Sequence, residues 1–352
     1  MLVFVDSFDH YGTSSDVLRK WGYAIGTTPT ISSGTGRGGS SSLRFPFQAS
    51  GFHVRHPLPT PVQTLIMGVA VRIYANGYPQ NPLPIHRFLD PVGANEQISL
   101  RLTNQGYLQV SRNGSVLATS SITLEFQTYY YIEFAATISN TTGSYRVRVD
   151  GQPVPGLPDV TNVNTQGQAN DQIGFFGLGT TSSIVGTSSG IDFDDLYVCD
   201  TSGDRNNNLL GDVRIICRTP DGNGDSSDFI GSDGDQTDNY ALVDETTPSL
   251  ADYVASVAAS ATDTYTLSDL ETAGAIKGVQ VTALAGRSDG GVTRYGQTVI
   301  VSGATEAASE QTPLSTDPRY IYGIFETDPS TGSPWTVSGV NDVQIGFRAT
   351  TD

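Results

Sequence analysis

Cysteine is nearly absent from the sequence, since Cys199 and Cys217 are the only two in 352 residues. This count excludes a disulfide-rich secreted scaffold and a zinc site made of several cysteines, and it leaves room for one disulfide bridge. A bridge between Cys199 and Cys217 requires the segments on either side of residues 201–208 to pack closely. Synthesis in a reducing cytosol favours two buried thiols instead. The sequence leaves both alternatives open.

Basic residues are also scarce. The chain has 19 Lys and Arg against 36 Asp and Glu, which gives a net charge of −17 and an isoelectric point near 4.4. Such a polyanion repels DNA, RNA and anionic bilayers, so we expect no nucleic-acid partner and no membrane insertion. No apolar run approaches the roughly 18 residues of a spanning helix, and residues 1–6 lack the basic start of a signal peptide. These absences predict a soluble protein made in the cytoplasm without a signal peptide.

Turn-forming and aromatic residues are abundant, with 39 Gly, 18 Pro, 16 Tyr and 14 Phe. This mixture favours strands over helices. In the first part of the chain, runs of β-branched and aromatic residues predict strands at 65–74, 97–103, 106–112, 129–138, 144–150, 172–178 and 191–199. Asn113-Gly114 and Asp150-Gly151 supply the positive φ of tight hairpins, and residues 14–21 predict one short helix. The pattern indicates an antiparallel β-sandwich.

The second part of the chain repeats this pattern, with strands predicted at 211–219, 263–267, 275–287, 292–302, 319–327 and 340–350. Residues 288–291 are predicted to close a long hairpin. Charge separates the two parts: residues 1–202 carry 11 basic and 14 acidic residues, net −3, and residues 203–352 carry 8 and 22, net −14. The polar stretch 201–208 marks a boundary near residue 205. We therefore predict an all-β protein of two antiparallel, jelly-roll-like β-sandwich domains, 1–204 and 205–352.

Three stretches resemble a group of tailed-bacteriophage virion structural proteins. They are residues 5–11 (VDSFDHY), residues 191–198 (IDFDDLYV), and residues 325–336 (FETDPSTGSPWT) followed by Gly339-Val340-Asn341. The first domain resembles a laminin-G or concanavalin-like jelly roll, whose last strand is often acidic and of the Ile-Asp-x-x-Asp-Leu type. The resemblance spans both ends of the chain and the domain boundary. It implies a non-enzymatic structural role, and it brings no catalytic residues with it.

The acidic strand Asp192-Phe193-Asp194-Asp195 is the first place to look for catalysis. Strand alternation puts Asp192 and Asp194 on one face about 7 Å apart, within the range of the carboxylate pairs of glycoside hydrolases. The Glu-x-Asp-x-x-Glu arrangement of concanavalin-like hydrolases is missing, however, and no Glu follows in the strand. We therefore interpret these aspartates as structural residues that end the sandwich and accept hydrogen bonds from turn amides. We predict that the protein is not an enzyme.

Asp221, Asn223 and Asp225 place three oxygen ligands at alternate positions, as calcium-binding loops do. Calcium suits such hard ligands. An EF-hand loop, however, has Gly at the sixth position and Glu at the twelfth, where this sequence has Ser226 and Ser232. The alternative is a solvated acidic loop between strands. Apart from calcium at these residues, we expect no cofactor.

Other chemistry-bearing residues form weaker patterns. His53 and His56 would share a face in a helix, which Pro57 disfavours, so a zinc site is not expected there. The glycine-rich residues 34–40 lack the Lys-Ser/Thr pair of a phosphate-binding loop, which predicts an exposed turn. Tyr129-Tyr130-Tyr131 offers a sugar platform or a protein anchor, but alternation sends half of such a run into the core.

The lead hypothesis is a non-enzymatic structural protein on the exterior of a phage virion, where it decorates the head or forms part of the tail. Its expected partners are other capsid or tail proteins, and a homo-oligomer and a host surface glycan are further candidates. The near-neutral first domain is the expected anchor, and the acidic second domain is expected to face solvent or a basic partner. The alternatives are a receptor- or carbohydrate-binding tail module and a polysaccharide depolymerase.

Overall fold

The computed structural model describes residues 1–26, 29–47, 51–180, 189–271 and 274–350. Strands account for 49% of the chain and helices for 6%, which confirms the predicted all-β class. The chain forms two compact units, Met1–Asp9 with Thr13–Ile215 and His10–Gly12 with Ile216–Asp352. Within the described ranges, the helices are all too short or too polar to cross a membrane.

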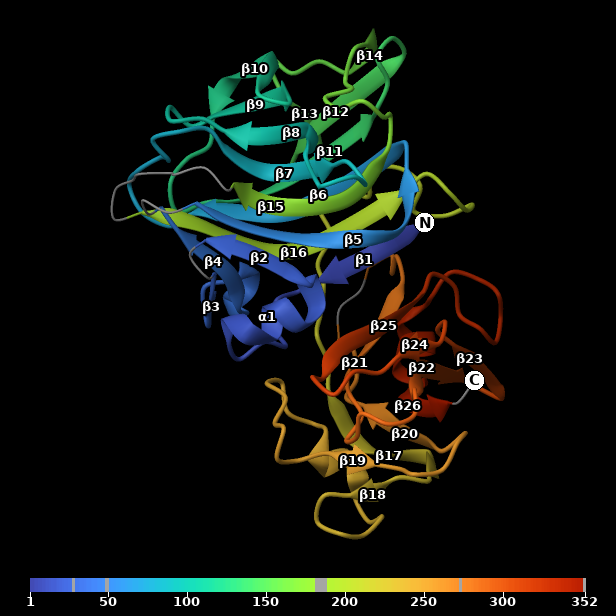
Figure 1. The fold of residues 1–352 in the computed structure, drawn as a ribbon. Coiled ribbons are helices and arrows are strands. Elements are labelled where there is room, and N and C mark those ends of the chain that lie inside the picture. The colour runs from blue at the N-terminus through green and yellow to red at the C-terminus, as the bar shows by residue number, and fades with distance from the viewer. Residues whose placement is uncertain (27–28, 48–50, 181–188, 272–273, 351–352) are drawn as a thin grey trace. The chain divides into compact units, whose positions relative to one another are not determined.

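The first unit contains a nine-stranded antiparallel sheet (Figure 1). Its strands follow the order β13-β12-β11-β6-β16-β4-β3, with β1 paired to β16 and β14 paired to β12. The bounds are β1 Leu2–Asp6, β3 Thr30–Ser32, β4 Ser42–Pro46, β6 Thr64–Ile73, β11 Tyr129–Thr137, β12 Gly143–Val149, β13 Gln152–Pro153, β14 Val160–Val163 and β16 Gly190–Asp200. The central strands β11, β6 and β16 are rich in β-branched and aromatic residues, which suit a pleated, largely buried surface.

A seven-stranded antiparallel sheet forms the other layer of this unit, in the order β10-β9-β8-β7-β15-β5-β2. The bounds are β2 Tyr23–Gly26, β5 Phe52–Val62, β7 Leu83–Leu89, β8 Glu96–Leu102, β9 Tyr107–Arg112, β10 Ser115–Thr123 and β15 Ile173–Thr180. Asn113 and Gly114, between β9 and β10, have φ values of 42° and 86°. The predicted tight hairpin at these two residues is therefore confirmed.

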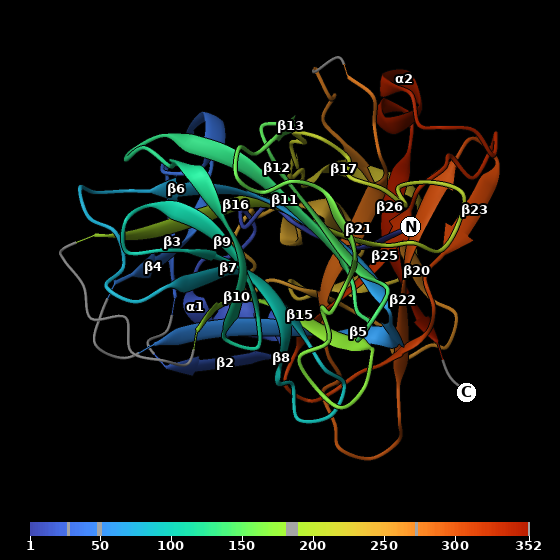
Figure 2. The same ribbon diagram turned by 90° about the horizontal axis from the view of Figure 1, so that it is seen from above.

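The two sheets of the first unit lie face to face (Figure 2). The buried side chains between them form its core. Phe88 of β7 stacks on Phe134 of β11 with 5.2 Å between ring centroids. Phe45 of β4 stacks on Phe52 of β5 at 3.9 Å. All four side chains are fully buried, and each contributes about 2 kcal/mol by removing apolar surface from water. The predicted antiparallel sandwich is the architecture of this unit.

The predicted short helix is α1 (Ser14–Trp21). Asp16 in its first turn accepts a hydrogen bond from the backbone N of Thr13 at 2.9 Å, which satisfies one donor at the helix start. The helix ends at Gly22, whose φ of 76° suits glycine. Trp21 donates from Nε1 to Asp6 of β1 at 2.9 Å. This buried bond fixes the helix against the first strand.

The second unit is built on a six-stranded sheet in the order β17-β20-β26-β22-β23, with β24 paired to β22, and on two two-stranded sheets, β21–β25 and β18–β19. The bounds are β17 Pro220–Ser227, β18 Ile230–Gly231, β19 Val254–Ala255, β20 Thr262–Leu267, β21 Val279–Ala285, β22 Tyr295–Ser302, β23 Thr305–Ala308, β24 Thr312–Pro313, β25 Arg319–Phe325 and β26 Gln344–Thr350, with helices η2 Asn239–Leu242 and α2 Val337–Asn341. Its core joins Val281 of β21 and Ile300 of β22 to Trp335, Val340 and Val343. Sheet β21–β25 therefore packs on the larger sheet in a small sandwich-like arrangement.

Some local predictions need correction. Residues 211–219 form no strand, because side chains of the first unit hold residues 211–215 instead of a neighbouring strand. The predicted boundary near residue 205 accordingly lies inside the first unit. Residues 288–291 close no hairpin, since β21 pairs with β25 and β22 pairs with β26. The sequence patterns also miss strands β5, β7 and β10.

Candidate functional site

Strand β16 carries the acidic residues that the sequence singles out, and Asp192 on it is fully buried. Arg44 of β4 and Arg72 of β6 lie opposite Asp192 on the two neighbouring strands. Arg44 Nε donates to Asp192 Oδ1 at 2.7 Å, and Arg72 Nη2 donates to Asp192 Oδ2 at 2.7 Å. These three residues form a charge ladder on the outer face of the nine-stranded sheet, which points away from the seven-stranded sheet. Both carboxylate oxygens are occupied.

Asp194 and Asp195 follow at a β-bulge, where the register of β16 against β6 shifts and Asp195 has a φ of 49°. Both carboxylates contact the short helix η1 (Arg37–Gly39) and its neighbours. The backbone N of Arg37 and Ser40 Oγ donate to Asp194 at 2.7 and 3.0 Å, and Arg37 Nη1 donates to Asp195 at 3.0 Å. The predicted turn is present, with Gly34, Gly38 and Gly39 exposed, and its other residues enclose the Asp194 carboxylate.

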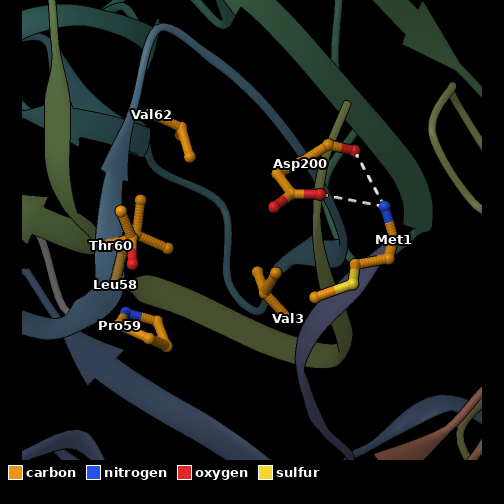
Figure 3. A pocket seen from close by; sticks show the side chains of 7 residues that line it. All are labelled: Met1, Val3, Leu58, Pro59, Thr60, Val62 and Asp200. Atoms are coloured by element: carbon orange, nitrogen blue, oxygen red, sulfur yellow. Dashed lines mark hydrogen bonds and ion pairs between the residues drawn. The ribbon is translucent and has the colours of Figure 1, made fainter. Parts of the chain in front are cut away.

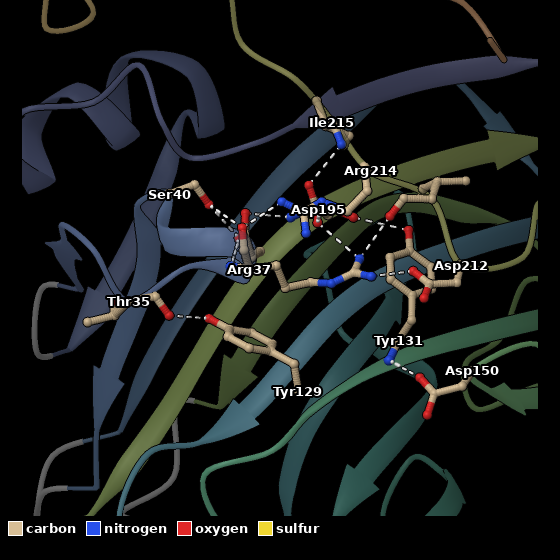
Figure 4. A network of polar contacts seen from close by, with 12 residues as sticks. Thr35, Arg37, Ser40, Tyr129, Tyr131, Asp150, Asp195, Asp212, Arg214 and Ile215 are labelled. Atoms are coloured by element: carbon tan, nitrogen blue, oxygen red, sulfur yellow. Dashed lines mark hydrogen bonds and ion pairs between the residues drawn. The ribbon is translucent and has the colours of Figure 1, made fainter. Parts of the chain in front are cut away.

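The same network holds the segment that leaves the first unit (Figure 4). Asp195 Oδ1 accepts from the backbone N of Ile215 at 2.8 Å. Arg37 Nη2 donates to Asp212 at 2.6 Å, and Arg214 Nε lies 3.1 Å from Asp195 Oδ2. These contacts dock residues 212–215 on the outer face of the sheet without a strand.

A second buried carboxylate holds the start of that segment. Glu133 of β11 accepts from the Tyr197 hydroxyl at 2.5 Å and from the backbone N of Gly211 at 2.9 Å. Gly68 of β6 lies between them in register, and a Cβ there would lie 2.2 Å from the Tyr197 ring. Glycine is required at this position because the ring crosses directly over the strand.

The surroundings of Asp194 raise the pKa of its carboxyl and so favour its protonated form. Burial raises the pKa of Asp194 to about 7, the charge of Asp195 adds to the rise, and the donors Arg37 and Ser40 oppose it. Burial likewise raises the pKa of Asp195, against the effects of Ile215, Arg214 and Arg37. A carboxyl that titrates near neutrality suits acid–base chemistry, but Asp194 is only 1% exposed and is surrounded by protein donors. The predicted hydrogen bonds from backbone amides to these aspartates are confirmed.

Tyr129 and Tyr131, two residues apart on β11, belong to the same face. Tyr129 donates to the backbone oxygen of Thr35 at 2.7 Å, and Tyr131, which is 1% exposed, donates to the backbone oxygen of Asp195 at 3.0 Å. Their hydroxyls therefore support the structural network and do not form an open sugar platform.

The outer face of the seven-stranded sheet presents a different set of side chains. Strand register places six residues side by side in one row across β2, β5, β15, β7, β8 and β9: Tyr23, Arg55, Gly177, Arg87, Ser99 and Ser111. Arg101 lies two residues after Ser99 on the same face and donates to Ser99 Oγ at 2.9 Å and to Glu96 at 2.5 Å. Glu96 also lies 3.5 Å from Arg87 Nε. In the part of the chain that the structure describes, Glu96 is the only carboxylate that pairs with an arginine of this face, and its two partners are Arg87 and Arg101.

Arg55 is held in this row by aromatic rings. Its guanidinium lies 3.8 Å from the centre of the Tyr23 ring and 5.1 Å from that of Phe175. His53 lies two residues before Arg55 and shares its face, whereas His56 points into the core, where it contacts Phe4. Burial and the charges of Arg87 and Arg55 lower the pKa of His53 to about 3, so its imidazole is neutral.

The predicted calcium ligands lie on a strand. They are exposed on one face of β17: Asp221, Asn223 and Asp225. The sequence predicts a calcium-binding loop or a solvated acidic loop at these positions. Asp221 accepts from Thr266 Oγ1 at 2.8 Å, and Asn223 accepts from the backbone N of Tyr240 at 3.1 Å. The described ranges contain no group of three or more His, Cys, Asp or Glu side chains that could hold a metal ion. Calcium binding at these residues stays a prediction.

The two cysteines fall in different units. Cys199 is buried near the end of β16 in the first unit, and Cys217 is partly buried in the second. Their pairing stays a prediction.

A small pocket of about 120 Å³ opens in the first unit beside β1 (Figure 3). Its walls are mostly apolar and are formed by Met1, Val3, Leu58, Pro59, Thr60, Val62 and Asp200. The charged group there, Asp200, is engaged by the amino group of Met1 at 2.9 Å. Nothing in the pocket points to a particular ligand.

Sequence reasoning missed the arginines of both outer faces. The pairing of Arg44 and Arg72 with Asp192 carries no local signal, because Asp192 is more than a hundred residues away in the sequence. Arg72, Arg87 and Arg101 do carry a signal of another kind, since each interrupts an apolar strand run at a position that alternation sends outward. That signal would have marked a polar face.

No protein-family model matches the sequence, and no curated protein matches it. Among solved structures, the chain shows distant similarity to concanavalin-like, jelly-roll β-sandwich proteins. Alginate lyase Aly36B is 15% identical over 56% of this chain and 96% of its own, with a TM-score of 0.42. Cellulose induced protein Cip1 is 15% identical over 61% and 99%, with a TM-score of 0.40. Trypanosoma rangeli sialidase is 18% identical over 45% and 25%, with a TM-score of 0.32.

Proposed function

We propose that the chain is a non-enzymatic structural protein on the exterior of a tailed-bacteriophage particle, as a head decoration or a tail component. The observation that carries the proposal is the resemblance of residues 5–11, 191–198 and 325–336 to virion structural proteins. Other virion proteins of the capsid or tail are its partners, and it assembles with them through protein contacts.

The state of the acidic strand supports a role without catalysis. Asp192 has both oxygens in ion pairs, and Asp194 accepts from two backbone amides and one hydroxyl. A general acid must reach the substrate with a tuned pKa, and these carboxyls are enclosed by the protein. Of the two alternatives, a polysaccharide depolymerase requires a carboxyl that the substrate can reach, whereas a receptor- or carbohydrate-binding tail module does not.

The charge of the second unit supports an anchor in the first unit. Ile216–Asp352 carries 6 basic and 20 acidic residues, net −14. Such surfaces repel one another over a Debye length of about 8 Å, so packed copies would keep them apart or place them against a basic partner. The first unit is then the anchor. Fragments that test this should end after Ile215, because residues 211–215 are docked on the first unit.

The test is to purify particles of the phage that encodes the sequence and to locate this chain on them. We expect stoichiometric amounts by mass spectrometry, and we expect antibodies against residues 216–352 to label the outside of intact particles. Absence of the chain from particles made in infected cells contradicts the proposal.

A reducing-sugar assay on host polysaccharide separates the depolymerase alternative. We expect no sugar release from the intact chain. Release that disappears in Asp192→Asn, with the circular dichroism spectrum unchanged, would show that the protein is an enzyme.

A further inference from the structure

The outer face of the seven-stranded sheet has more cationic donors than the protein satisfies. Arg87 and Arg101 share the single carboxylate of Glu96, and Arg55 is a third arginine on this face, on a chain whose net charge is −17. Among the described residues, the Arg55 side chain has no ion-pair partner, and its Nε has no hydrogen-bond partner. A surplus of positive charge on this one face of a strongly acidic protein is unexpected unless an anion completes it.

Several buried polar atoms of this face also lack hydrogen bonds. They are His53 Nε2, Arg55 Nε and Ser111 Oγ, all without a hydrogen-bond partner among the described residues, whereas Arg87 Nε lacks a hydrogen bond but lies 3.5 Å from Glu96. Leaving a buried polar group unpaired is costly, and each such group in a folded protein requires an explanation. Because these atoms belong to strands β5 and β9 of one sheet face, the binding of one ligand to that face would satisfy all of them.

Glycine is required at the middle of the row. Gly177 of β15 lies between Arg55 and Arg87 in register, and it has no side chain to cover the sheet there. A Cβ at Gly177 would lie 3.1 Å from His53 Nε2 and 2.5 Å from the backbone oxygen of Val54. Glycine within a strand marks the close approach of a ligand or another backbone. Gly177 is bordered by two residues with guanidinium groups, Arg55 and Arg87, and by the imidazole of His53.

We propose that this face binds an acidic oligosaccharide, with a sugar carboxylate over Gly177 between Arg55 and Arg87. Guanidinium groups bind carboxylates through charge-assisted, planar pairs of hydrogen bonds. His53 donates from Nε2 to the same group, and Ser111 Oγ bonds a sugar hydroxyl further along the row. This binding site goes beyond the structural role proposed above and does not rest on it.

The length and chemistry of the row favour an oligosaccharide over a small anion. From Tyr23 to Ser111 the row crosses five strand spacings, or about 24 Å. Its end is aromatic, since Tyr23 is 36% exposed, and Phe175 lies beside Arg55. Rings of this kind pack on the apolar faces of sugars and leave their hydroxyls to the polar groups.

The test is a calorimetric titration of the intact chain with a hexamer of galacturonic acid. Maltohexaose is the neutral control of equal length, and sodium sulfate is the small-anion control. We expect the acidic hexamer to bind and both controls to bind at least about tenfold more weakly. Failure of the acidic hexamer to bind at millimolar concentration overturns the proposal, and so does equal binding of maltohexaose. Equal binding of sulfate overturns the assignment to a sugar.

Variants locate the site. Arg55→Gln and Arg87→Gln should each weaken binding about tenfold, the effect of losing one charge-assisted hydrogen-bond pair. Arg146→Gln removes the same charge from β12 of the other sheet, where Arg146 bonds Asn208, and should leave the affinity unchanged. If Arg87→Gln unfolds, Ser111→Ala and the nuclear magnetic resonance signal of the His53 ring replace it. Unchanged affinity in Arg55→Gln, with an unmoved His53 signal on titration of the wild type, rules the site out.

Discussion

The two outer faces of the first unit handle charge in opposite ways. On the nine-stranded sheet each of the four buried acidic groups meets donors from the protein itself: Glu133, Asp192, Asp194 and Asp195. On the seven-stranded sheet Arg87 and Arg101 share Glu96, Arg55 pairs with no carboxylate among the described residues, and several buried polar atoms lack hydrogen bonds. A polar network that is satisfied internally makes a structure rigid, whereas spare donors at high energetic cost indicate a ligand. Substitutions on the first face should therefore change stability, and those on the second should change binding.

The largest expected effect is the pH dependence due to Asp194. Its pKa rises to about 7 in the folded protein, so the folded chain keeps this proton after the unfolded chain has lost it. The free energy of unfolding should then fall as the pH rises from about 4 to about 7, by about 4 kcal/mol. Asp194→Asn, neutral at every pH, should lack that part of the decline in urea titrations.

The control for this prediction is Asp159→Asn, which alters an exposed partner of Arg148 and should keep the decline. The other charged groups near Asp194 are Asp9, Asp195, Arg37 and Arg214, and they are present in both proteins. If the free energy of unfolding changes by the same amount between pH 4 and pH 7 in the wild type and in Asp194→Asn, the raised pKa of Asp194 is contradicted.

Next in size is the loss of Asp192. Asp192→Ala leaves Arg44 and Arg72 without their shared carboxylate and should destabilise the fold by about 3 kcal/mol in urea unfolding. Asp159→Ala breaks an ion pair of similar geometry at the surface and should cost less than about 1 kcal/mol. Equal losses in the two variants mean that the ladder is no more important than a surface pair.

A smaller effect is expected from Glu133→Gln. The amide keeps one oxygen but loses the charge that binds the Tyr197 hydroxyl and the Gly211 amide, at a cost of about 2 kcal/mol. Hydrogen exchange at Gly211 should become faster than in the wild type, because this residue begins the docked segment. If exchange there is unchanged, Glu133 does not hold the segment.

The smallest effect compares two buried serines of the seven-stranded sheet. Ser120 Oγ accepts from the backbone N of Leu108 and donates to the backbone oxygen of Ile122, so Ser120→Ala should cost about 1 kcal/mol. Ser111 Oγ has no partner among the described residues, so Ser111→Ala should be neutral or slightly stabilising. Thermal unfolding of both variants measures the difference, and a larger loss for Ser111→Ala shows that its hydroxyl is already satisfied.

The local pattern of side chains in the sequence predicted most of the fold. The prediction of 129–138 as a strand differs from β11 by one residue, because alternating apolar side chains are a local property. The expected strand at 211–219 was wrong for the opposite reason: its amides bond to side chains from residues 133 and 195, which no local pattern reveals.

The candidate sites were harder to foresee. The arginines that surround Asp192 come from positions 44 and 72, and only the register of three strands brings them together. The row around Gly177 likewise depends on the order of six strands. The sequence identified the acidic strand, but it contains no information on which partners complete it.

The most direct test of the difference between the two faces is urea unfolding of Arg55→Gln beside Arg72→Gln. Arg72 bonds the buried Asp192, and its loss should lower the free energy of unfolding by about 2 kcal/mol or more. Arg55 pairs with no carboxylate in the described part of the chain, so its loss should change stability by less than about 0.5 kcal/mol. A loss in Arg55→Gln as large as that in Arg72→Gln would show that both faces are structural and would contradict the account.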